Sequence, residues 1–250
     1  MSNNQNTDRF FIPHVGERYQ DGIHGKKLLV LGASFYCKET ICCPHYKNCT
    51  GTGEHRIWST RDFDCDCNGR INYRISQMPS TELDYDGARS YRRFVELMCD
   101  FKDGKGSGST LTAARFDSFW ETCAFTNYIQ RMIGGRTTTK KKDIREKEDM
   151  NAFLTTLDEL MPDIVIVWGC VIDKVLKKYH PEDNVILNDY DKSDDYLFRW
   201  TYKGKRITFL CLYHPSSSRF YSEEQWEIAL KYLELIFRSE EPKESIAMVK

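Results

Sequence analysis

Short apolar runs along the chain predict buried strands. Residues 26–31 (KKLLVL) form one run, which ends at Gly32, and residues 164–168 (IVIVW) form a second; both are typical of strands covered on two faces. Residues 124–130 (AFTNYIQ) predict a further strand that carries one polar residue, Asn127. The stretch YLFRWTYKGKRITFLCLYHPSSS predicts two strands that are joined at Lys203 and Gly204.

Apolar residues at helical spacing separate these strands. The spacing predicts helices over residues 87–101, 111–120 and 150–161, from Gly169 to about residue 179, and from a cap at Ser222 to residue 237. Gln225 would complete a capping box with Ser222. Because helix and strand alternate, we expect an α/β fold with a parallel sheet between layers of helices.

The polar segments indicate one domain with flanking and inserted parts. We expect a disordered arm over residues 1–9, a single domain over 10–238 and a frayed tail over 239–250. Residues 37–80 lack periodicity and predict a cysteine-rich insertion. The glycine-rich stretch FKDGKGSGST predicts a flexible connection between two helices.

Composition excludes several classes of protein. The 250 residues include 36 Lys and Arg against 37 Asp and Glu, which gives a formal net charge of -1. A neutral total removes a whole-molecule electrostatic case for binding nucleic acid, so such binding would need a local basic surface. The sequence has no apolar run near the roughly 20 residues that span a bilayer and no apolar signal-peptide core. We therefore expect a soluble, cytoplasmic protein without membrane contact.

Polar residues follow the ends of three of the predicted strands, and this is the most informative feature of the sequence. The strand-end sequences are LVLGASFYC, AFTNYIQ and FLCLYHPSSS. In open α/β sheets, ligands bind beyond the carboxyl ends of the strands. His214, held on a rigid turn by Pro215 and followed by three serines, would offer an imidazole and groups suited to anions. In an alternative interpretation, this turn only caps the last helix.

In this order, the motifs GASFY, FTNYIQ, PDIVIVWG and YHPSSSR resemble the uracil-DNA glycosylase superfamily, over roughly residues 11–237 apart from the insertion. The resemblance implies a three-layer α/β/α sandwich with a central four-stranded, mainly parallel sheet. It also implies DNA or a nucleotide as the partner and cleavage of the N-glycosidic bond of a flipped or damaged base.

The resemblance assigns roles to individual residues. Asn127 would read the edge of the flipped base, and His214 would donate to the departing base. Catalytic roles fall to His214 and Ser34, and base or substrate contacts fall to Gly32, Ala33, Phe35, Tyr36, Asn127, Ser216, Ser217 and Ser218. The types of these residues suit the chemistry, because a departing base gains negative charge and an amide both donates and accepts hydrogen bonds.

The first motif departs from the pattern of the active branches, which place Asp, Asn or Glu there to orient water. Ala33 and Ser34 occupy these positions, and serine is a weak base at neutral pH; Glu39 is the nearest other carboxylate. An alternative function is therefore a non-catalytic binder of nucleic acid or a nucleotide. A third hypothesis is an esterase-like hydrolase with Ser34 as nucleophile and His214 as base.

A local basic surface would contact DNA phosphates despite the neutral total. The candidates for this contact are Arg131, Arg136, Lys140, Lys141, Lys142 and Arg219. Most such charge runs are solvated loops or helix faces, and that remains the alternative interpretation.

Six of the 10 cysteines crowd into the insertion: Cys37, Cys42, Cys43, Cys49, Cys65 and Cys67. Together with His45 they provide enough soft ligands for a structural zinc ion. An iron-sulfur cluster, known from some branches of the superfamily, and free or reversibly paired thiols are the alternatives. The proposed chemistry itself requires no cofactor.

Overall fold

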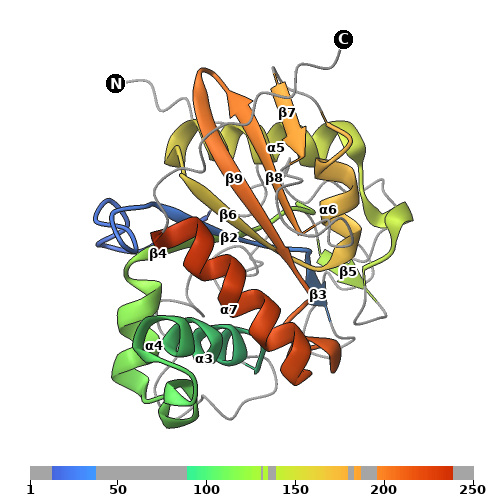
Figure 1. Ribbon diagram of the computed structural model, residues 1–250. Coiled ribbons are helices and arrows are strands. Elements are labelled where there is room, and N and C mark those ends of the chain that lie inside the picture. Colours follow the sequence, from blue (N-terminus) through green and yellow to red (C-terminus); the bar gives the residue numbers. More distant parts are fainter. Residues whose placement is uncertain are drawn as a thin grey trace.

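A computed structural model describes residues 13–37, 89–130, 132–134, 139–179, 183–186 and 196–238 (Figure 1). The arm expected over residues 1–9 and the tail expected over 239–250 lie outside these ranges, as does nearly all of the cysteine-rich insertion.

One mixed sheet organises the described part of the chain (Figure 1). Its strands are β1 (His14–Val15), β2 (Leu28–Gly32), β4 (Cys123–Asn127), β6 (Ile164–Trp168), β7 (Asp183–Ile186), β8 (Leu197–Tyr202) and β9 (Lys205–Leu212). They lie in the order β1-β4-β2-β6-β9-β8-β7, in which the central pairs β4-β2, β2-β6 and β6-β9 are parallel. The protein is therefore an α/β protein whose parallel core consists of the strands that the apolar runs predict.

The sheet is wider than the four strands that we expected. β1 adds an antiparallel strand beside β4, and β8 and β7 add antiparallel strands beyond β9. β8 and β9 are joined by a two-residue turn at Lys203 (φ 50°) and Gly204 (φ 74°), as the sequence predicts. Positive φ at both positions matches the turn type that suits the twist of a hairpin, so this connection is necessarily antiparallel.

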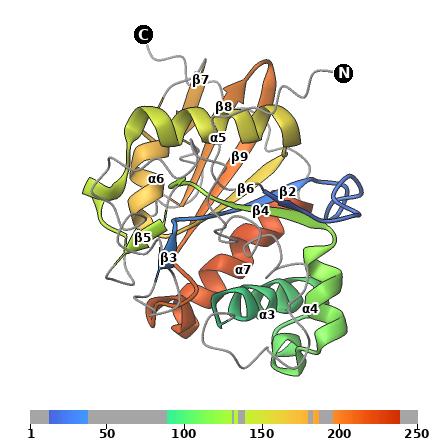
Figure 2. The same cartoon turned by 180° about the vertical axis from the view of Figure 1, so that it is seen from behind.

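Helices cover both faces of the sheet (Figures 1 and 2). One face carries α3 (Arg89–Asp103), α4 (Ala113–Trp120) and α7 (Glu223–Arg238), and the other carries α5 (Glu146–Leu160) and α6 (Cys170–Leu176). Side chains of β2 alternate between the two layers: Leu28 and Val30 pack on the α3 side, whereas Leu29 and Leu31 pack on the α5 side.

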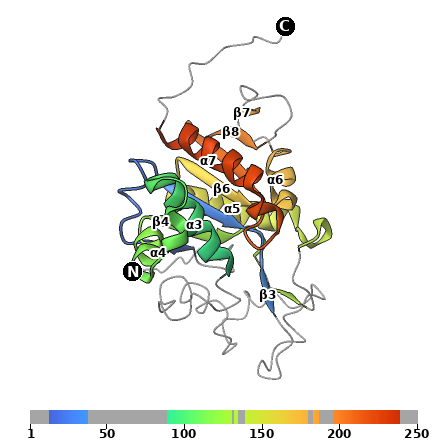
Figure 3. The same cartoon turned by 60° about the horizontal axis from the view of Figure 1, so that its bottom comes forward.

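A second, two-stranded sheet begins where β2 and β4 end. β3 (Phe35–Cys37) pairs in parallel with β5 (Met132–Gly134), and Figure 3 shows β3 extending away from the main sheet. No sequence pattern predicts a strand at residues 35–37, which the structure places in β3. The reason is that the segments following β2 and β4 leave the edge together and pair their backbones.

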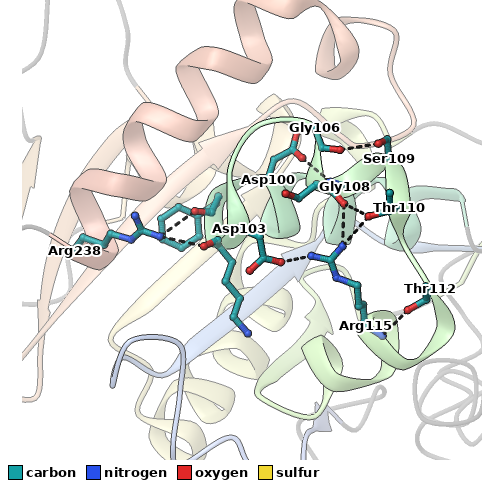
Figure 4. A network of polar contacts seen from close by, with 12 residues as sticks. Asp100, Asp103, Gly106, Gly108, Ser109, Thr110, Thr112, Arg115 and Arg238 are labelled. Carbon is teal, nitrogen blue, oxygen red and sulfur yellow. Dashed lines mark hydrogen bonds and ion pairs between the residues drawn. The ribbon is translucent and has the colours of Figure 1, made fainter.

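The connection between α3 and α4 differs from the flexible segment that we expected. Asp100 is buried and accepts hydrogen bonds from the backbone N–H of Gly108 (2.6 Å) and from Nε1 of Trp226 (2.9 Å). Arg115 pairs with Asp103 and donates to the carbonyl oxygen of Ser107 (2.9 Å; Figure 4). The glycines here serve a compact turn: a Cβ at Gly108 would overlap the backbone of α3.

Candidate functional site

The carboxyl ends of the four parallel strands meet at one edge of the sheet, which we call the carboxyl edge. Gly32 at the end of β2 lies opposite Asn127 at the end of β4, and Trp168 at the end of β6 lies opposite Leu212 at the end of β9. His214 follows β9 by two residues. The polar strand ends singled out in the sequence therefore lie at the same edge, as parallel pairing requires.

Asn127 and Gly32 are in direct contact. A Cβ at Gly32 would overlap Oδ1 of Asn127 and would lie 3.1 Å from Cζ of Phe125. The amide thus lies across the glycine, on the sheet face that carries α3 and α7. Asn127 is 2% exposed, and its Nδ2 has no hydrogen-bond partner among the described residues. A buried amide donor without a partner is costly, and a bound ligand would satisfy it.

The backbone around Asn127 is held by two further residues. Its carbonyl oxygen accepts a hydrogen bond from Nε2 of Gln130 (2.5 Å). The buried carboxylate of Asp149 in α5 accepts from the backbone N–H groups of Gln130 (3.1 Å) and Arg145 (2.7 Å). The end of β4 is consequently fastened to the first turn of α5.

The imidazole of His214 is held in one tautomer. Its Nδ1 accepts a hydrogen bond from the backbone N–H of Ser216 (3.1 Å), and the Ser216 hydroxyl lies 2.7 Å from the same atom. A backbone N–H can only donate, so Nδ1 carries no proton, and the proton of the neutral ring is on Nε2. Nε2–H is therefore the donor that His214 can present to a ligand.

The indole ring of Trp168 lies next to the imidazole of His214. The two rings are edge to face, with centroids 6.0 Å apart and planes at 82°. Burial lowers the pKa of His214 from 6.5 to about 4, so the ring is neutral at physiological pH. Gly169 lies next to His214: a Cβ there would lie 3.8 Å from Cβ of His214, an ordinary van der Waals contact.

The serines after His214 form a tight turn. Ser217 donates its backbone N–H to the carbonyl oxygen of His214 (2.8 Å), and its hydroxyl accepts from the N–H of Phe220 (3.3 Å). The cap of α7 is Ser222, whose hydroxyl accepts from the N–H of Gln225 (3.3 Å). The side chain of Gln225 does not complete the expected capping box and accepts instead from the hydroxyl of Tyr196 (2.9 Å). The turn carrying His214 is thus separate from the cap of the last helix.

Arg93 of α3 contacts the turn that follows His214. Its Nη1 donates to the carbonyl oxygen of Pro215 (3.1 Å), and its guanidinium group lies 3.9 Å from the ring centroid of Tyr221. The sequence did not single out Arg93, because only its spatial neighbours give it a role.

The side chains of the two residues of the first motif contact groups other than His214. Ala33 packs in the core on the α5 side, opposite the face of Asn127. The hydroxyl of Ser34 lies 3.1 Å from that of Thr139. Because Ser34 pairs with Thr139 and Nδ1 of His214 pairs with Ser216, the hydrogen bonds of these side chains do not form the Ser-His pair that an esterase would use. Phe35 and Tyr36 contribute backbone to β3.

Part of the expected basic surface is described. Lys140, Lys141 and Lys142 are exposed and follow Thr139, so the contact with Ser34 brings this segment to the carboxyl edge. Arg219 is exposed, with its guanidinium 5.6 Å from the ring centroid of Tyr213. The other two candidates, Arg131 and Arg136, lie outside the described residues.

The expected metal ligands fall almost wholly outside the structure. Cys37 contributes backbone to β3, and the remaining candidates, Cys42, Cys43, Cys49, Cys65 and Cys67, are not among the described residues, nor are His45 and Glu39. Within the described ranges, no group of three or more His, Cys, Asp or Glu side chains is placed to hold a metal ion.

Sequence reasoning missed the aromatic residues that surround Gly32. Tyr91 of α3 is half-buried, and its ring centroid lies 5.2 Å from that of Phe125 and 5.6 Å from that of Trp168. These two rings belong to β4 and β6, the strands on either side of β2. The helical spacing of Tyr91 predicted only a core position.

Comparison with known proteins adds no relative: no protein-family model matches the chain, and no curated protein matches it either. In the part of the chain that is described, no helix is long and apolar enough to cross a membrane. The fold and the site together define an α/β protein with a polar site at the carboxyl edge of its parallel strands.

Proposed function

We propose that the carboxyl edge binds a base that has left its stack in DNA, and that His214 stabilises this base while its N-glycosidic bond is cleaved. The observation that carries the proposal is the neutral imidazole of His214, whose Nδ1 is occupied by Ser216 and whose Nε2–H is left as a donor. The resemblance of the strand-end motifs to the uracil-DNA glycosylase superfamily supports the same role.

In the proposed reaction, a water oxygen bonds to C1′ of the deoxyribose and the bond from C1′ to the base nitrogen breaks. The bonding electrons go to the base, and negative charge develops on a carbonyl oxygen next to that nitrogen. Nε2–H of His214 donates to that oxygen, beside the ring of Trp168. The attacking water releases its proton to solvent, and the products are a free base and an abasic site.

Asn127 supports the proposal as the group that reads the base. An amide offers one donor and one acceptor edge, which matches the neighbouring carbonyl and N–H of a pyrimidine such as uracil. The unpartnered Nδ2 of Asn127 would gain its hydrogen bond only when the base is bound. Phosphates on either side of the base would meet Lys140, Lys141, Lys142 and Arg219 together with the serine turn.

Release of uracil from a uracil-containing oligonucleotide tests this function. His214→Ala should lower the rate at least about 100-fold, since removal of one preorganised donor to a developing anion costs about that much. His24→Ala, at an exposed histidine in the turn before β2, is the matched control and should leave the rate unchanged. Equal rates for the wild type and His214→Ala would refute the catalytic role.

A second candidate function is binding without catalysis, and the surroundings of Ser34 favour it. Ser34 pairs with Thr139, and Asp149, the buried carboxylate behind the end of β4, uses its two oxygens to accept backbone N–H groups. The hydrogen bonds of both groups thus go to other protein groups, which favours binding without activation of a water molecule. Tight binding of single-stranded or abasic DNA with no base released from any substrate would favour this candidate over the first.

A further inference from the structure

The carboxyl edge also carries three aromatic rings in contact, those of Tyr91, Phe125 and Trp168, which we call the aromatic wall. None of the sequence motifs explains the presence of Tyr91 there. Tyr91 lies in the first turn of α3, and its ring is edge to face with Phe125 (63°) and with Trp168 (66°). Since Phe125 and Trp168 belong to the strands that flank β2, Tyr91 lies above the end of β2, where Gly32 has no side chain.

The same position is bounded by the polar groups of the site. Asn127 lies across Gly32 on one side, and Trp168 connects Tyr91 to His214 on the other. The contacts Asn127 to Gly32, Tyr91 to Trp168 and Trp168 to His214 thus bring an amide, a phenol ring and an imidazole around one strand end. This face of the sheet belongs to the layer of α3 and α7.

We propose that Tyr91 is the residue against which the ring of the bound heterocycle stacks. The inference rests on the proposed function and deepens it: it assigns the stacking group to α3, whereas the motif after β2 suggested Phe35 and Tyr36. Two observations point to a planar ligand. Tyr91 is only half-buried although its neighbours Phe125 and Trp168 are 2% exposed, and the buried Nδ2 of Asn127 lacks a partner. Stacking on an aromatic side chain tolerates any base, so Asn127 and His214 would supply the selectivity.

The test uses the full chain and a short single-stranded oligonucleotide with one central 2′-fluoro-2′-deoxyuridine, which presents the uracil ring but whose glycosidic bond resists cleavage. Tyr91→Leu should weaken binding about tenfold, the usual cost of losing one stacked base, whereas Tyr91→Phe keeps the ring and should bind as the wild type does. Tyr179→Leu is the matched control, since Tyr179 is also a half-buried tyrosine, but its ring packs at a tilt against Trp200 on the α5 side of the sheet.

A second measurement separates stacking from a purely structural role and does not depend on how Tyr91→Leu folds. In NMR spectra of the wild-type complex, the H5 and H6 signals of uracil should move upfield through the ring current of Tyr91, and the Tyr91 ring signals, assigned with Tyr91→Phe, should shift. If the oligonucleotide binds without these shifts, or binds Tyr91→Leu as tightly as the wild type, the base does not stack on Tyr91. The proposed function would still stand. If the wild type does not bind it, both fail.

Discussion

At the scale of single residues, the tightest constraint in the site is the contact between Gly32 and Asn127. The amide occupies the volume that any side chain at Gly32 would need. Gly32 has no positive φ, so its role is one of space rather than of backbone conformation. The position and orientation of the Asn127 amide therefore depend on a residue in the neighbouring strand.

This contact makes a specific prediction for Gly32→Ala. The new methyl group must displace the Asn127 amide, so we expect a loss of about 1–3 kcal/mol in the free energy of unfolding, the usual cost of overpacking, together with loss of base binding. In an Asn127→Gly background the same substitution should cost much less stability. Urea unfolding of the four proteins measures this coupling, and additive effects of the two substitutions would contradict the contact.

The same scale shows which site residues a sequence can reveal. His214 and Asn127 are recognisable because each is a polar residue at the end of an apolar run. Tyr91 and Trp168 are aromatic residues in apolar patterns, and nothing local distinguishes a ring that lines a site from one that fills a core. Ala33 shows the opposite error: its place in a motif suggested a ligand contact, whereas its side chain packs in the core on the α5 side.

At the scale of elements, α5 positions the strand end that carries Asn127. Asp149 lies in the first turn of α5 and is 1% exposed, and it joins two segments by accepting N–H groups from Gln130 and Arg145. A carboxylate near a helix N-terminus also interacts favourably with the helix dipole. This side chain therefore has a capping role and a positioning role.

We expect Asp149→Ala to lower the free energy of unfolding by about 2–3 kcal/mol, because one buried and one partly buried N–H group lose a charged acceptor. Uracil binding should also weaken, since the backbone of Gln130 and with it Asn127 is released. Asp100→Ala is the matched control, because Asp100 is a buried carboxylate that accepts a backbone N–H in the turn after α3. It should lose stability by a similar amount and keep its affinity for uracil; a parallel loss of affinity in both variants would argue against a positioning role.

The elements that the sequence revealed are those with long periodic patterns. The parallel strands β2, β4, β6 and β9 and the helices α3, α4, α5, α6 and α7 were all predicted within a few residues. The strands β1, β3, β5 and β7 were not, because each has only two to four residues and is defined by its pairing partner rather than by a pattern of its own.

At the scale of the whole molecule, two histidines make stability depend on pH. Burial lowers the pKa values of His14 and His214 below the usual 6.5, although Nε2 of His14 lies 3.0 Å from the carbonyl oxygen of Trp120. Both rings are therefore harder to protonate in the folded protein than in the unfolded chain. The unfolded state therefore binds more protons between pH 6.5 and the lowered values, so stability is complete above pH 6.5 and decreases as the pH falls.

Urea unfolding should accordingly give a free energy about 1 kcal/mol lower near pH 5 than near pH 7.5, a modest value because both rings are partly exposed. Replacing both histidines with glutamine, which removes the titrating groups, should flatten this dependence. Equal or greater stability of the wild type near pH 5 would show that neither ring is held neutral.

The placement of α3 and β3 has an evolutionary consequence. β3 leaves the sheet at the carboxyl edge, and the first turns of α3, with Tyr91 and Arg93, lie at the same edge. The described residues on either side of the intervening segment thus lie at one edge of the sheet. Insertions or deletions in that segment can therefore accumulate without shifting the register of any strand, so homologous chains can differ greatly in length here while keeping the sheet, α3 and the site residues in place.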